Sequence, residues 1–155
     1  MKNFKIHTLV VNIVVFLSLF LSYQRHKIFD SSGDNWFDSS SIKSINPIAG
    51  IELPETYFFL GGVLLITFVT LIWRNLATAI IGSVLSIGLG LYIPLLAFIL
   101  TFNIFQEGDD LGIGYYIGSI AIIYFIVIQF INMVQMARNK KSKSKIVDSD
   151  ILDDF

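Results

Sequence analysis

Four long apolar stretches, separated by polar segments, dominate the pattern of this chain. They lie at residues 6–22, 57–73, 77–102 and 111–136. A helix needs about 20 predominantly apolar residues to cross the hydrocarbon of a bilayer. The pattern therefore predicts an all-α integral membrane protein, a four-transmembrane-helix bundle within residues 1–137, followed by a basic and then acidic cytoplasmic tail at 138–155.

The first apolar stretch permits two interpretations. Lys2 and Lys5 precede it, and a charged start before an apolar run is also typical of a secretory signal. A cleavable signal needs small residues at two positions near the end of the apolar run. In residues 20–23, FLSY, only one of these two positions holds a small residue. We therefore favour a retained first span, with cleavage of residues 1–22 as the alternative.

Small residues recur at every fourth position in the third stretch. They are Thr78, Gly82, Ser86, Gly90 and Pro94. This spacing places them on one helix face, where a neighbouring helix can approach closely. Gly114 and Gly118 form a similar pair in the fourth stretch. We expect both sets to serve helix packing within the chain rather than a dimer face, and Pro94 to bend its helix because it lacks an amide donor.

The polar segment at residues 23–56 is rich in turn-forming residues. We expect it to form an outer loop with little regular structure and one short interfacial helix around Trp36 and Phe37. Three carboxylates in this loop are spaced by four residues, at Asp30, Asp34 and Asp38. Their spacing does not match a calcium-binding loop, so we favour a solvated loop without a metal site.

Composition supports a membrane location. Hydrophobic residues make up 54% of the chain, charged residues 15%, and the mean hydropathy is +0.71. A soluble domain of this size would not tolerate that balance on its surface. The chain has no cysteine, which excludes disulfides, thiolate metal ligands and a cysteine nucleophile.

The distribution of basic residues predicts the topology. With both termini in the cytoplasm, the inner side holds Lys2, Lys5, Arg74, Arg138, Lys140, Lys141, Lys143 and Lys145. The outer side then holds only Arg25, Lys27 and Lys43. This bias follows the positive-inside rule, and it predicts a multi-pass protein of the plasma membrane, with a bacterial inner membrane favoured by the residue usage. The basic tail fits the same rule, and binding of anionic lipid there is the alternative.

No Asp, Glu, Lys or Arg lies within the four spans, which disfavours ion-coupled transport. Three uncharged polar residues, Asn12, Gln129 and Asn132, are expected at similar depth and in hydrogen bonds between the first and fourth helices. We interpret them as structural contacts in preference to a polar conduction path. The two histidines fall on opposite sides of the membrane, so we expect no catalytic residues, no metal and no cofactor.

These observations favour a protein that acts by recognition in the lipid bilayer, as an accessory, regulatory or immunity-type subunit. The expected partner is a membrane or extracytoplasmic protein rather than nucleic acid, and the candidate contacts are Trp36 and Phe37. An oligomeric channel or carrier for a neutral or weakly charged solute remains the alternative.

Overall fold

The computed structural model describes the backbone of residues 2–29, 42–73, 75–101 and 110–152. Its helices are α1 (Lys2–Ser18), α2 (Tyr57–Ile72), α3 (Leu76–Thr101) and α4 (Ile113–Leu152). Its strands are β1 (Ser22–Phe29), β2 (Ile42–Ala49) and β3 (Asp110–Leu111). Two short 3-10 helices, η1 (Gly50–Glu52) and η2 (Pro54–Thr56), connect β2 to α2. The chain is therefore mostly helical, with a small sheet.

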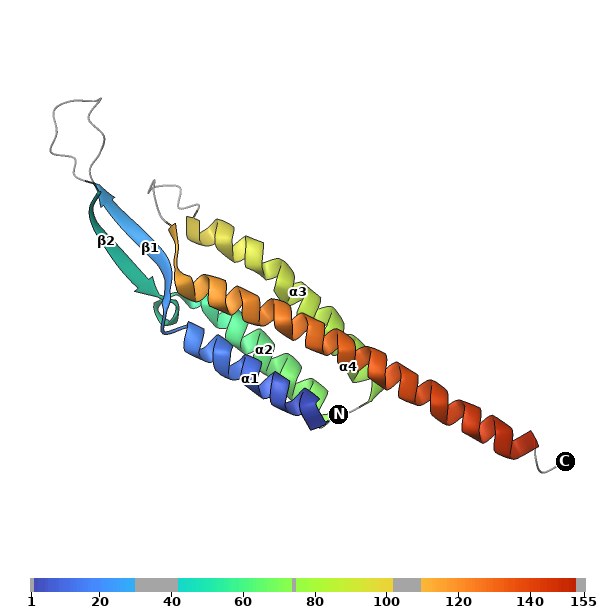
Figure 1. The fold of residues 1–155 in the computed structure, drawn as a ribbon. Helices are drawn as coiled ribbons and strands as arrows, with labels where there is room; N and C mark the ends of the chain where they lie inside the picture. The colour runs from blue at the N-terminus through green and yellow to red at the C-terminus, as the bar shows by residue number, and fades with distance from the viewer. Residues whose placement is uncertain (1, 30–41, 74, 102–109, 153–155) are drawn as a thin grey trace.

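The four helices run side by side as a bundle, with the strands at one end (Figure 1). We call this the sheet end. The N-terminus and the free end of α4 lie at the opposite end, which we call the tail end (Figure 1). Helix α4 packs against both α1 and α3, and α2 packs against α3 and α1. The helices bury a common apolar core, in which the fully buried side chains include Val15, Phe59, Leu96, Ile122 and Phe125.

Three helices are long and apolar enough to cross a membrane. They are Pro54–Ile72, Leu76–Thr101 and Ile113–Lys141. The first apolar helix, Phe4–Ser18, is shorter. It ends four residues before the boundary expected from hydropathy, because residues 19–21 form a turn and Ser22 already belongs to β1. The predicted helical bundle is confirmed at this level, while the first apolar stretch is divided between a helix and the start of a strand.

The expectation that residues 23–56 have little regular structure was wrong. Strands β1 and β2 form an antiparallel hairpin, with Arg25 opposite Pro47, and β3 pairs with the other edge of β1. Pro47, one of the turn-forming residues of this segment, lies within β2, which is an edge strand where a residue without an amide donor is tolerated. The predicted helix at Trp36 and Phe37 lies outside the described residues, as do the three carboxylates that were weighed as a cation site, Asp30, Asp34 and Asp38.

The tail continues the last helix. The backbone of α4 remains helical through the basic segment and as far as Leu152. No glycine or proline follows Gly118 within α4, so no residue there interrupts the helix. As a result, α4 projects well beyond the other helices at the tail end (Figure 1).

Candidate functional site

Two of the predicted packing glycines mark where α3 meets its neighbours. A Cβ at Gly82 would overlap Thr70 Cγ2 of α2 and lie 3.3 Å from Gln129 Oε1 of α4. A Cβ at Gly90 would lie 2.6 Å from Ile126 Cδ1 of α4. Both positions therefore need the absence of a side chain to let the helices approach.

Two other members of this stripe, Ser86 and Pro94, behave differently from each other. Ser86 is fully buried, and its hydroxyl donates to the backbone oxygen of Ser83 at 2.8 Å. Pro94 lies inside α3 and is exposed, so it contributes no buried contact. The stripe drifts from the core to the surface along α3, as expected for a four-residue spacing on a helix with 3.6 residues per turn.

Three glycines surround the fully buried ring of Tyr23 at the sheet end. A Cβ at Gly50 or Gly114 would lie 2.6 or 2.7 Å from Tyr23 Cδ2, and a Cβ at Gly118 would overlap the Tyr23 hydroxyl. That hydroxyl is hydrogen-bonded to Ser18 Oγ at 2.9 Å. Burial raises the pKa of the Tyr23 phenol above its ordinary value, and the Ser18 hydrogen bond offsets part of that rise. Tyr23 thus joins the sheet to α1 and α4 as a neutral, buried group.

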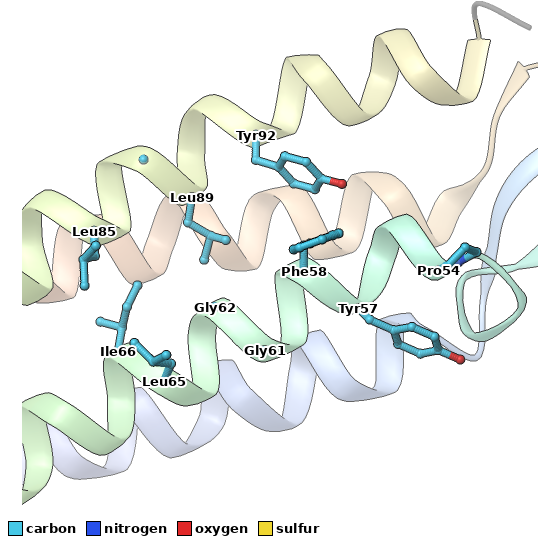
Figure 2. A pocket seen from close by; sticks show the side chains of 11 residues that line it. Pro54, Tyr57, Phe58, Gly61, Gly62, Leu65, Ile66, Leu85, Leu89 and Tyr92 are labelled. Carbon is cyan, nitrogen blue, oxygen red and sulfur yellow. The ribbon is translucent and has the colours of Figure 1, made fainter.

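Gly61 and Gly88 differ from the other glycines of the described chain because a Cβ at either would meet nothing within 4 Å. Both line a groove of about 580 Å³ between α2 and α3, shown in Figure 2. The adjacent Gly62 is different, since a Cβ there would lie 2.7 Å from Leu89 Cδ1. Gly61 and Gly88 therefore form part of an open surface and have no packing role inside the chain.

The groove is apolar along its length. Phe58 and Tyr92 face each other across it, with ring centroids 5.9 Å apart (Figure 2). The Tyr92 hydroxyl donates to the backbone oxygen of Glu55 at 2.9 Å, and the Tyr57 hydroxyl donates to that of Ile51. Because both hydroxyls already have acceptors, the groove offers shape and apolar contact area rather than polar recognition.

The three predicted intramembrane polar residues are brought into the bundle, but with other partners than expected. Asn12 Nδ2 donates to Thr67 Oγ1 of α2 at 2.9 Å, whereas a contact with α4 was anticipated. Gln129 and Asn132 are buried on α4. Neither polar atom of the Gln129 side chain has a hydrogen-bond partner, and Asn132 Oδ1 has none either.

Metal-ligating side chains do not converge within the described part of the chain. No three His, Cys, Asp or Glu side chains come close enough there to hold a metal ion. His7 Nδ1 is 2.9 Å from the Tyr124 hydroxyl, and both residues are exposed on the outside of the bundle. This pair ties α1 to α4, and Tyr124 also lines an apolar groove of about 270 Å³ between these two helices.

Comparison of the chain with protein-family models, with curated proteins and with solved structures gives no match. The candidate site therefore stands on its geometry alone. Sequence reasoning did not single out Gly61, Gly88 or Phe58 as a binding surface. The adjacent glycines Gly61 and Gly62 were the available signal, but only the packing of α2 against α3 distinguishes the open one from the packed one.

Proposed function

We propose that this chain is a multi-pass membrane protein that recognises the transmembrane helix of another membrane protein in the groove between α2 and α3. The observation that carries the proposal is the pair Gly61 and Gly88, which line the groove and have no neighbour of their own chain. In a bilayer, small residues on a helix surface allow a second helix to approach closely, and they are enriched at such interfaces.

The dimensions and chemistry of the groove support a helix as the occupant. Its lining comes from two helices and is apolar, and large side chains such as Phe58 and Leu65 flank the open glycines. A groove bordered by bulky residues with a small-residue floor accepts the ridge of another helix. Association then depends on van der Waals packing, because lipid is as apolar as the helix surface.

The orientation in the membrane follows from charge. Glu52, Glu55 and Asp110 lie at the sheet end, whereas Arg138, Lys140 and Lys141 follow the apolar part of α4 at the tail end. We infer that the tail end is cytoplasmic and the sheet end is extracytoplasmic, in a plasma membrane of bacterial type. The same basic residues would also attract anionic lipid, at about 1 kcal/mol each.

The hairpin supports recognition outside the membrane as well. Strand β2 is an edge of the sheet, and its backbone groups on the outer side are available to an extended segment of a partner. The connection between β1 and β2 contains Trp36 and Phe37 in the sequence, and we keep both as proposed partner contacts. In this proposal the chain is a non-enzymatic accessory, regulatory or immunity-type subunit without a cofactor.

A second candidate, an oligomeric channel or carrier for a neutral solute, is favoured by a different observation. The Gln129 amide and the amide oxygen of Asn132 lie inside the bundle without hydrogen-bond partners, and polar groups at membrane depth often mark a functional site. Experiments can distinguish the two candidate functions, because partner recognition depends on the α2–α3 groove and solute passage depends on the polar groups inside the bundle.

Filling the groove tests the proposal. Gly88→Leu adds a side chain where nothing of the chain lies within 4 Å, so the fold should be retained. Partner recovery with the tagged protein, extracted from native membranes in mild detergent, should then fall at least about tenfold, the equivalent of 1.4 kcal/mol. Val127→Phe is the matched control, because Val127 is exposed on α4 and does not line the groove. Equal recovery with wild type, Gly88→Leu and Val127→Phe would refute the proposal.

A further inference from the structure

The side chain of Gln129 occupies an unusual position in the tail half of the bundle. It is fully buried, yet neither Nε2 nor Oε1 has a hydrogen-bond partner in its own chain. Exchanging the positions of Nε2 and Oε1 by a 180° rotation of the amide would leave both atoms without partners, because neither position has one. Buried polar groups in native proteins are nearly always paired, either with protein atoms or with ordered water.

Three helices meet at this amide. Gln129 Oε1 faces Gly82 of α3, and Thr70 of α2 faces the same glycine. The hydroxyl oxygen of Ser83 on α3 lies 3.1 Å from the backbone oxygen of Gln129, the longer of two contacts that share its single hydrogen. Gly82 therefore provides room for the Gln129 amide, and methyl groups of Thr70 and Ile66 border the same space.

The donors on the other polar side chains of the bundle interior named here are already engaged. Asn12 Nδ2 donates to Thr8 O at 2.7 Å and to Thr67 Oγ1 at 2.9 Å. The hydroxyl of Thr70 donates to a carbonyl of its own helix at 2.8 Å, and that of Ser83 does the same at 2.9 Å. A hydroxyl has a single hydrogen to give, so Thr70 and Ser83 act towards any further group mainly as acceptors.

The acceptors are in excess. Three amide oxygens, Asn12 Oδ1, Gln129 Oε1 and Asn132 Oδ1, are buried without a donor. Gln129 Nε2 is likewise without an acceptor, so the missing group must both donate and accept hydrogen bonds, and it must be small. No carboxylate lies in the described spans to compensate a cation, so a neutral donor fits and an ion does not.

We propose that Gln129 and Asn132 bind water molecules inside the tail half of the bundle. Asn132 lies three residues nearer the free end of α4 than Gln129, so the hydrated site extends towards the tail end. On the other side Phe125 and Ile122 are fully buried and form an apolar layer. Water thus enters from the tail end and stops at Phe125. This site is separate from the α2–α3 groove, so its test does not depend on whether the groove binds a partner.

Radiolytic labelling in ¹⁸O-water tests the site, because hydroxyl radicals formed from bound water modify side chains beside it. Phe125 and Phe59 are both fully buried phenylalanines, and they form a matched pair. Phe125 lies one helical turn from Gln129 on α4, whereas Phe59 packs near Tyr92 towards the sheet end. Mass spectrometry of the full-length protein in nanodiscs should show several-fold more ¹⁸O on Phe125 than on Phe59. Equal labelling of the two would overturn the proposal.

Gln129→Leu provides a second test. It removes the polar atoms while keeping a side chain of similar bulk, so ¹⁸O labelling of Phe125 should fall to the level of Phe59. Gln129→Met replaces it as the test if the leucine variant does not fold, because methionine has similar length and no donor. Unchanged labelling of Phe125 in a folded variant would show that Gln129 does not hold the water, and would overturn the assignment.

Discussion

Replacing Gly118 with alanine tests the packing of the sheet against the bundle. The new Cβ would overlap the Tyr23 hydroxyl and lie 3.1 Å from Ser18 Oγ. It therefore displaces the partners of the 2.9 Å Ser18–Tyr23 hydrogen bond, in a site where Tyr23 is fully buried. Overpacking costs about 1–3 kcal/mol, and loss of a buried hydrogen bond costs about 1 kcal/mol more. We expect Gly118→Ala to lower the free energy of unfolding by about 2–4 kcal/mol.

Gly61→Ala is the matched control for this prediction. Nothing lies within 4 Å of a Cβ at Gly61, which is also inside a helix. Alanine is favoured over glycine in a helix interior by up to about 1 kcal/mol, so this variant should be as stable as wild type or more stable. Unfolding of both variants by SDS titration from mild micelles, followed by circular dichroism, measures the difference.

Tyr23→Phe in the Gly118→Ala background identifies the cause. It removes the oxygen that the new Cβ would overlap, while the ring atom Cζ would lie 3.5 Å from that Cβ, an ordinary contact. The double variant should therefore regain part of the stability lost in Gly118→Ala, which is a non-additive result. The reasoning is refuted if Gly118→Ala unfolds like wild type, or if Tyr23→Phe adds its own loss without any recovery.

Two further predictions concern polar groups. Burial raises the pKa of Tyr23 above its ordinary value of 10.0, so the unfolded chain ionises first and stability should fall as the pH rises past that value. Tyr23→Phe should show a smaller fall in SDS unfolding between about pH 9 and 11, and an unchanged fall would contradict the burial of this phenol. The Asn12–Thr67 hydrogen bond of 2.9 Å should give a coupling of about 0.6–1 kcal/mol in a double-mutant cycle of Asn12→Leu and Thr67→Val. Strict additivity of the two substitutions would contradict that bond.

The helices were readable from the sequence because lipid requires long apolar runs, and α2 and α3 begin and end within one residue of the predicted spans. The hairpin was not readable. Its first strand is mostly polar, and Pro47 in its second strand indicates a turn unless that strand is known to lie at a sheet edge. The end of α1 was predicted too late for a related reason. Residues 19–22 are apolar enough to continue a helix, but they form a turn that leads into β1.

The candidate site depends on which helices become neighbours. Gly61 and Gly62 are adjacent in sequence and equally small, yet only Gly62 meets a side chain of α3. Gly82 and Gly88 lie on the same helix, but Gly82 faces Thr70 and Gln129 while Gly88 faces open space. Spacing indicates that small residues share a face, and it does not indicate whether the chain itself or a partner covers that face.

Site-specific photo-cross-linking in native membranes tests the central claim most directly. Phe58 in the groove and Ile120 on α4 are exposed to similar extents, 69% and 67%, so a photoreactive phenylalanine analogue at each position reports on equally accessible surfaces. The account predicts a defined protein adduct from position 58, absent from position 120 and lost when Gly88→Leu fills the groove. Lipid adducts alone at both positions would contradict it.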